Sequence, residues 1–336
     1  MFESFYGLKE DPFSIRPDPT FLLLTLQHQR ALSVLQYGLE ARAGFTVVTG
    51  AIGTGKTTLI RRLFQIIGKQ YTTGLVSNAQ DDSFEELLQW ILLAFGLEYK
   101  GKSKVELYQT FTDFLVEECV NGRSVVLVID EAQHLGPRSL EQLRMLSNVN
   151  ADKQDLLQMV LVGQPDLREL LLRQELFQFA QRITADCHLE PLDAGETDHY
   201  VRHRIEVAGG ERTLFTDQAL QLVWKYTGGV PRLINALCGM ALVYGFADQK
   251  AHIDGDLVRE VVTDKQLGLS PIVGRRAIKK GTTIAQLQQS DTVDAPAVAG
   301  TEHGNRRVTA AGSPYVEARM TDDPEELRDL PRKARP

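Results

Sequence analysis

The sequence has few cysteines and no long apolar run. Only 3 of its 336 residues are cysteine, and Cys119, Cys187 and Cys238 stand singly, without the paired spacing of a redox motif or a zinc site. No stretch approaches the roughly 18 apolar residues that a membrane-spanning helix requires, and the first residues lack the apolar centre of a signal peptide. We therefore expect buried free thiols in a reducing compartment and a cytoplasmic protein.

The sequence also lacks an excess of positive charge. Its formal net charge is −7 at pH 7, whereas domains that bind nucleic acid usually carry a basic patch or stripe. Composition therefore does not predict a polyanionic partner, although a local basic patch remains compatible with an acidic total. With 43% apolar and 24% charged residues, the composition is typical of a globular protein, and the length allows about two domains.

One stretch carries a specific signal. Residues 50–57 read Gly-Ala-Ile-Gly-Thr-Gly-Lys-Thr after a short apolar run, which is the pattern of a phosphate-binding loop. Glycines let backbone N–H groups approach phosphate oxygens, Lys56 supplies a mobile cation, and the Thr57 hydroxyl suits Mg²⁺. The helical pattern over 56–67 argues against a chance glycine-rich turn. The sequence predicts a nucleoside triphosphate site made of Gly50, Ala51, Ile52, Gly53, Thr54, Gly55, Lys56, Thr57 and Thr58.

A pair of acidic residues follows a second apolar run. Residues 125–129 suit a strand buried on both faces of a parallel sheet, and Asp130 and Glu131 come directly after it. Ligands of such sheets bind at the carboxyl ends of the strands. We expect Asp130 to hold Mg²⁺ and Glu131 to polarise the attacking water. The alternative is an acidic pair that caps the next helix.

A third apolar run, 157–162, ends in Gly163 and Gln164. We predict that Gln164 contacts the γ-phosphate or the attacking water, and Asn148 is the second candidate for this contact. An ordinary turn residue at the end of a strand is an equally good interpretation of Gln164.

Apolar runs alternate with helical patterns up to about residue 191, which predicts a three-layer α/β domain with a parallel sheet over 25–192. Before it, 1–24 is rich in aromatics and prolines, and we expect a strap across this domain that lines the nucleotide base. Only helical patterns cover 193–268, which predicts a small all-helical domain. The polar tail, 269–336, is expected to be largely disordered. Within the first domain we expect helices over 27–41, 56–67, 84–95, 104–119 and 167–179.

Several motifs together resemble a known family. Over residues 1 to about 267 the chain is similar to the AAA+ ATPases of the general secretion pathway protein A, or ExeA, type. Longer members continue into a transmembrane segment and a peptidoglycan-binding domain, so the polar tail resembles the short form and implies no direct contact with the cell wall. The motifs are Phe-Tyr-Gly-Leu-Lys-Glu-Asp-Pro-Phe at 5–13, the phosphate-loop residues at 50–58, Asp-Glu-Ala-Gln at 130–133, Val-Gly-Gln-Pro-Asp-Leu at 162–167 and Gly-Gly-Val-Pro-Arg-Leu-Ile-Asn at 228–235.

The resemblance implies an enzyme that hydrolyses ATP with Mg²⁺ as a homo-oligomer, whose neighbouring subunits complete each site. Arg182 matches the finger that reaches the γ-phosphate of the next subunit, and Arg232, on a lid helix, matches the second sensor; a guanidinium suits both roles. The implied function is to energise or assemble a secretion or exopolysaccharide export system, in the cytoplasm or peripherally at the inner membrane through partners.

Two other functions stay open. A DNA-associated ATPase of the transposition-helper or origin-recognition type shares the same ATPase plan, so DNA is the alternative partner. No winged-helix or helix-turn-helix pattern follows the lid, and the basic cluster that stands out is Arg275, Arg276, Lys279 and Lys280. The third hypothesis is a nucleotide-dependent switch that hydrolyses its nucleotide very slowly. The substrate, the ring size and the role of the tail stay open.

Overall fold

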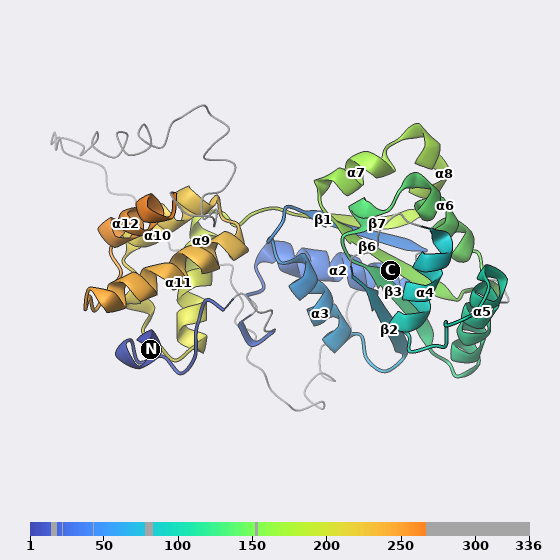
Figure 1. The fold of residues 1–336 in the computed structure, drawn as a ribbon, viewed down its shortest axis with the longest axis horizontal. Helices are drawn as coiled ribbons and strands as arrows, with labels where there is room; N and C mark the ends of the chain where they lie inside the picture. Colours follow the sequence, from blue (N-terminus) through green and yellow to red (C-terminus); the bar gives the residue numbers. More distant parts are fainter. Residues whose placement is uncertain (15–18, 22, 43, 78–82, 152–153, 267–336) are drawn as a thin grey trace, which may run out of the picture. The chain divides into compact units, whose positions relative to one another are not determined.

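Five parallel strands form the sheet that positions the predicted site. The computed structural model describes residues 1–14, 19–21, 23–42, 44–77, 83–151 and 154–266, so the tail 269–336 and the basic cluster at 275–280 lie outside it. The strand order is β2-β3-β6-β1-β7, which confirms the predicted parallel α/β domain (Figure 1). The strands are β1 (Phe45–Gly50), β2 (Tyr71–Val76), β3 (Ser124–Ile129), β6 (Leu157–Gly163) and β7 (Ile183–Leu189).

Alternate residues of the central strands face two separate hydrophobic cores. In β3, Val125, Leu127 and Ile129 belong to one core, and Val126 and Val128 to the other. This alternation of an entirely apolar strand explains why helices cover both faces. On one face pack α2 (Leu26–Glu40) and α3 (Lys56–Ile66); on the other pack α4 (Phe84–Ala94), α5 (Lys104–Val120), α6 (Pro137–Leu146) and α7 (Pro165–Leu171).

The region between β3 and β7 differs from the prediction. The structure contains α6 and a short antiparallel pair, β4 (Asn150–Ala151) and β5 (Gln154–Asp155), which we did not predict. The single helix expected over 167–179 is wrong: α7 ends at Leu171, Arg173 is extended (φ −65°, ψ 144°), and a 3-10 turn leads into α8 (Phe177–Ala180). Apolar spacing concealed the break, because leucines on both sides of it enter the same core.

A second, all-helical domain follows β7, as predicted. Its core is separate from the two cores of the sheet domain. In the described part of the chain, no helix has both the length and the apolar character needed to cross a membrane. The domain comprises α9 (Ala194–Val207), a 3-10 turn (Arg212–Leu214), α10 (Asp217–Thr227), α11 (Pro231–Ala247) and α12 (Gly255–Gln266).

The N-terminal segment packs on the helical domain, not across the sheet domain as expected. It contains α1 (Phe2–Phe5) and a 3-10 turn (Pro19–Phe21). Leu8 and Phe13 are buried in the helical domain's core, and the Lys9 N–H donates to the carbonyl oxygen of Ala208 at 2.8 Å. Its aromatic composition indicated burial, but composition carries no information about which domain covers it.

The three cysteines are free thiols in the structure. Cys238 is fully buried, and burial raises its pKa. Burial also raises the pKa of Cys187 to about 12. Because the thiolate is the reactive form, these two cysteines suit a structural role.

Candidate nucleotide-binding site

The phosphate loop connects the end of β1 to the start of α3. Gly53 (φ +82°) and Gly55 (φ +97°) lie in the left-handed region that favours glycine. At Gly50 a Cβ atom would lie 2.8 Å from the Leu189 carbonyl oxygen of the neighbouring strand, so the loop passes close to β7. The loop delivers the chain into the first turn of α3, whose unpaired N–H groups and positive end favour an anion.

Lys56 is held inside this loop. Its side chain is only 6% exposed, and its Nζ donates to the carbonyl oxygens of Gly50 at 2.8 Å and Ala51 at 3.0 Å. Burial lowers the pKa of Lys56, while the charges of Glu131 and Asp130 act in the opposite direction. The loop therefore encloses a cation that its own backbone oxygens orient.

Thr57 and Asp130 meet at the edge of the loop. The Thr57 hydroxyl donates to Oδ2 of Asp130 at 2.9 Å, and Oδ1 of Asp130 accepts the Glu131 N–H at 2.9 Å. Hydroxyl and carboxylate oxygens are the ligands that Mg²⁺ prefers, so these two residues fit the metal predicted from the sequence. Within the described ranges no cluster of three or more His, Cys, Asp or Glu side chains gathers, so Mg²⁺ here would draw its other ligands from water and phosphate.

Two glutamine side-chain amides donate hydrogen bonds to the Glu131 carboxylate. Its Oε2 accepts hydrogen bonds from Nε2 of Gln133 at 2.5 Å and from Nε2 of Gln164 at 3.1 Å. The sheet order explains the second contact, because β6 lies between β1 and β3 and delivers Gln164 between loop and carboxylate. Burial raises the pKa of Glu131, but the two amides and the charge of Lys56 outweigh it and hold the pKa below its usual value.

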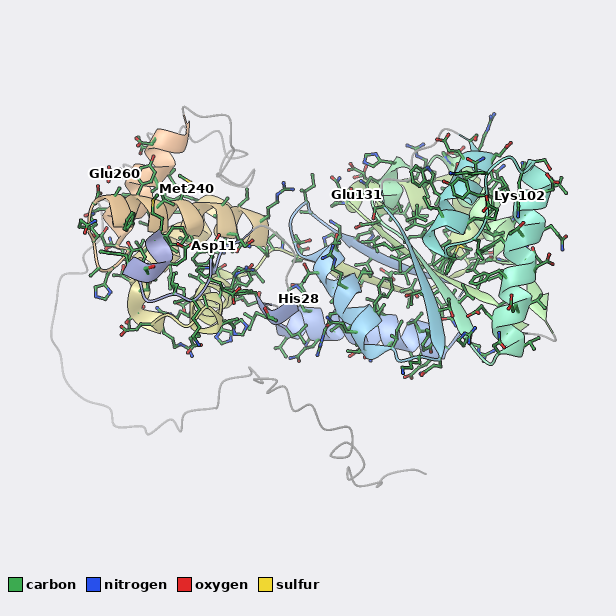
Figure 2. The ribbon with its side chains drawn as sticks, turned by 60° about the horizontal axis from the view of Figure 1, so that its bottom comes forward. Asp11, His28, Lys102, Glu131, Met240 and Glu260 are labelled. Atoms are coloured by element: carbon green, nitrogen blue, oxygen red, sulfur yellow. The ribbon has the colours of Figure 1, made fainter. Side chains whose placement is uncertain are left out.

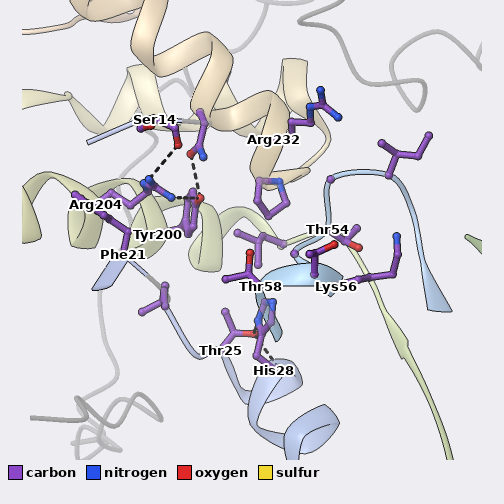
Figure 3. A pocket seen from close by; sticks show the side chains of 18 of the residues that line it. Ser14, Phe21, Thr25, His28, Thr54, Lys56, Thr58, Tyr200, Arg204 and Arg232 are labelled. Atoms are coloured by element: carbon purple, nitrogen blue, oxygen red, sulfur yellow. Dashed lines mark hydrogen bonds between the residues drawn. The ribbon is translucent and has the colours of Figure 1, made fainter. Parts of the chain in front are cut away.

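A cavity of about 420 Å³ opens beside the loop, a volume that suits a small-molecule ligand (Figure 3). The N-terminal segment contributes to its wall, and its contact with a nucleotide base stays a prediction. Lining residues include the loop residues 52–58, the apolar side chains of Phe21, Leu23, Leu192 and Pro231, and the polar side chains of Thr25, His28, Tyr200, Arg204 and Asn235.

His28 is one of the lining residues that the sequence analysis missed. It lies on α2, on a different segment of the chain from Glu131, which follows β3. Figure 2 labels both residues. The ring is 6% exposed, and its Nδ1 lies 2.9 Å from the Thr25 hydroxyl. Burial lowers the pKa of His28, and a hydrogen bond with the Thr54 backbone opposes this. Burial thus favours the neutral form of this ring, which contacts the phosphate loop at Thr54.

The start of α11 rests on the phosphate loop. The Arg232 N–H donates to the Gly53 carbonyl oxygen at 3.3 Å, and a Cβ atom on Gly53 would lie 2.6 Å from the Cβ of Arg232. Only glycine at position 53 allows this approach. The Arg232 side chain is exposed and borders the cavity, so the structure brings Arg232 to the site with the loop, Asp130, Glu131 and Gln164.

Arg182 is not brought to this site. It precedes β7, and Ile183 pairs with Phe45 at the start of β1, whereas Leu189 pairs with Gly50 at the loop. At roughly 3.3 Å per residue, Arg182 lies about 20 Å along the sheet from its own phosphate loop. There its Nη1 donates to the Ser147 hydroxyl at 3.1 Å.

Asn148, the second candidate for the contact assigned to Gln164, does not lie at this site. Asn148 directly follows Ser147, the partner of Arg182, and therefore belongs to the edge where β6 begins. Gln164 directly follows the other end of that strand. The prediction failed because the unpredicted helix α6 carries the chain back across the sheet.

A buried guanidinium network closes the end of the cavity that is remote from Lys56 (Figure 3). Arg204 is 7% exposed, and it donates to the carbonyl oxygen of Pro12 and, at 2.9 Å, to the Tyr200 hydroxyl. That hydroxyl donates to Oδ1 of Asn235 at 3.0 Å. The Arg204 guanidinium also lies over the Phe21 ring, 4.7 Å from its centre. No sequence motif marked these residues, which are scattered among helical patterns.

This network predicts that Arg204 fastens the N-terminal segment to the helical domain. We expect Arg204→Met, which keeps the volume but removes the donors, to speed amide hydrogen exchange in residues 8–13 about tenfold, because a hydrogen bond from a charged group contributes about 1.5 kcal/mol or more. Arg212→Met, at an arginine exposed to solvent, is the matched control. Unchanged exchange in Arg204→Met would remove this fastening role.

Two sequence comparisons agree with the geometry. Residues 39–171 match the family model described as an AAA domain. General secretion pathway protein A of Aeromonas hydrophila is 43% identical over 248 residues, which cover 74% of this chain and 45% of that protein. The chain therefore spans about half the length of the curated relative it matches.

Solved structures of similar fold include ORC2 and Cdc6p proteins. The Aeropyrum pernix ORC2 protein, in ADPNP-ADP complexes, superimposes with a TM-score of 0.59 at 18% identity, covering 76% of this chain and 72% of that one. Cdc6p from Pyrobaculum aerophilum superimposes with a TM-score of 0.58 at 18% identity, covering 80% and 72%. At such identities the likeness establishes the fold alone.

Proposed function

We propose that this chain, which belongs to the AAA ATPases of the general secretion pathway protein A type, binds ATP with Mg²⁺ and hydrolyses it to drive an envelope secretion or export system. One observation carries the ATPase part: buried Lys56, the Thr57–Asp130 pair and Glu131 converge on a glycine loop at the start of a helix. That arrangement combines an anion site, a pair of metal ligands and a base in one place.

Each residue then has a distinct role. Lys56 and the loop N–H groups bind the phosphates, and Thr57 and Asp130 hold Mg²⁺, which neutralises charge on the phosphate oxygens. Glu131 accepts the proton of the attacking water as the water oxygen bonds to the γ-phosphorus and ADP departs. Gln164 contacts the γ-phosphate, and Arg232 joins it from the helical domain.

The position of Arg182 supports an oligomer. Because Arg182 lies at the edge of the sheet opposite its own loop, it can serve hydrolysis only in the site of another subunit. We therefore assign Arg182 to the γ-phosphate of a neighbouring copy of the chain. Ring assembly would bring the two together.

The sequence relative supports the pathway. A protein named for the general secretion pathway matches most of the chain at 43% identity, and we propose an ATPase of this type working in the cytoplasm, with partners at the inner membrane. The likeness to the ORC2 and Cdc6p structures supports the shared fold and carries no argument for DNA binding, since those identities are 18%.

Lys56→Ala tests the nucleotide site. We expect the variant to lose measurable ATP binding, an affinity loss of about 100-fold or more, because the buried ammonium supplies the charge-assisted hydrogen bonds to the phosphates. Isothermal titration with ATP and Mg²⁺ measures this, and Lys69→Ala, at an exposed lysine, is the control. Binding by Lys56→Ala with wild-type affinity would contradict the site.

The hydrolysis rate with and without duplex DNA, over a series of salt concentrations, separates the two partner classes. The proposed function expects a rate that DNA leaves unchanged. Strong stimulation that disappears as salt rises would favour the DNA-associated alternative, because release of counterions from the phosphates makes DNA binding salt-dependent.

A further inference from the structure

We propose that Gln133 is a positioning residue of this site: it holds the Glu131 carboxylate in place for the attacking water and is itself anchored by Gln164. The inference rests on the proposed ATPase function. It concerns a residue that contacts neither the phosphate loop nor the Thr57–Asp130 pair in any hydrogen bond within the described residues.

Both the NH₂ group and the oxygen of the Gln133 side-chain amide make hydrogen bonds. Its Nε2 donates to Oε2 of Glu131 at 2.5 Å, and its Oε1 accepts the backbone N–H of Gln164 at 3.0 Å. The opposite orientation of the amide would face the carboxylate with an oxygen and the N–H with an NH₂ group. The two contacts therefore define the amide orientation, with the NH₂ group toward Glu131.

The space for this amide depends on the strand beside it. A Cβ atom on Gly163 would lie 2.8 Å from Oε1 of Gln133, so a larger residue at the end of β6 would push the amide away. On the other side, a tight turn presents Gln133, in which the His134 N–H donates to the Glu131 carbonyl oxygen at 3.0 Å. The end of β6 and this turn thus define the space that the Gln133 side chain occupies.

Glu131 needs such an anchor. Its backbone has φ +54°, an uncommon conformation for a residue with a side chain. Its second amide partner, Gln164, is the residue assigned to the γ-phosphate, and a Gln164 amide that turns to the phosphate leaves Glu131. Gln133 has no such competing role, so it keeps Oε2 occupied while Oε1 of Glu131 remains available to the water.

Two substitutions distinguish positioning from space filling. We expect Gln133→Ala to lower kcat about 10- to 100-fold with the ATP dissociation constant within twofold of wild type, because a displaced base costs rate and not binding. Gln133→Glu keeps the shape and the acceptor for the Gln164 N–H but lacks the donor, so we expect an equal or larger loss. Gln109→Ala, on the exposed face of α5, is the matched control and should hydrolyse at the wild-type rate.

A double-mutant cycle tests the link to Glu131. In a Glu131→Gln background, Gln133→Ala should lower the residual rate by less than twofold, since the contact it removes no longer orients a carboxylate. Wild-type kcat in Gln133→Glu, or a full second loss in the double variant, would overturn the inference while leaving the ATPase function intact.

A wild-type chain that binds ATP without hydrolysing it would instead defeat the proposed function. The NMR signal of the Gln133 side-chain NH₂ group then tests the inference. This signal is assigned as the one that disappears in Gln133→Ala. We expect that signal to shift in Glu131→Gln. An unchanged signal would overturn the contact itself.

Discussion

Replacing Arg182 by alanine is expected to lower the ATPase rate about 10³-fold while ATP affinity stays at the wild-type value. A guanidinium that neutralises charge on the transferring phosphoryl group contributes roughly 10³ to 10⁵ in rate. Arg182 lies about 20 Å along the sheet from its own loop, so the loss appears in hydrolysis and not in binding. Steady-state turnover and nucleotide titration measure the two quantities, and Arg168→Ala, at an exposed arginine of α7, is the control.

Mixing two inactive variants identifies the subunit that Arg182 serves. Arg182→Ala keeps an intact pocket, and Lys56→Ala keeps Arg182 but not the cation of the loop. A mixture should recover activity, because a Lys56→Ala subunit can present its arginine to the pocket of an Arg182→Ala neighbour. If the mixture stays as inactive as its components under conditions where the chains co-assemble, Arg182 does not act between subunits.

Glu131→Gln is expected to bind ATP normally and to hydrolyse it about 10² to 10⁴ times more slowly than wild type. The amide has the size of the carboxylate but accepts no proton, and general base catalysis contributes an effect of about this size. Slow turnover with intact binding should make the variant accumulate bound ATP, which chromatography of the nucleotide released after denaturation would show.

The control for this variant is Glu169→Gln, which makes the same chemical change at an exposed position of α7. It should turn over at the wild-type rate. Equal rates in wild type and Glu131→Gln would remove Glu131 from the role of base and leave the two amides without a catalytic partner to position.

Local patterns predicted the parts of the molecule whose cause is local. The phosphate loop needs glycines at 53 and 55 for backbone conformations with positive φ, so its chemistry is visible in eight consecutive residues. The apolar run that becomes β3 likewise predicted a strand buried on both faces, with Asp130 and Glu131 at its end. Prediction failed at the break after α7, because leucines on both sides of the extended residue Arg173 are buried in the same core.

Contacts between distant segments could not be predicted in the same way. Gln133 lay within a recognised motif, yet its partner, the backbone of Gln164, is 31 residues away along the chain. Arg204 donates a hydrogen bond to the carbonyl oxygen of Pro12, 192 residues away along the chain. No residue spacing in either segment predicts this contact.

The sequence alone therefore predicts the class of ligand, because a phosphate loop is built from neighbouring residues whose backbone conformations follow from their own residue types. Which groups surround that ligand depends on strand order and on packing between domains. The order β2-β3-β6-β1-β7 sets Gln164 between the loop and Glu131, and the packing of the N-terminal segment on α9 places Arg204 in the cavity wall. The tertiary structure determines these placements, because they result from the burial of whole helix and sheet faces and not from any short sequence pattern.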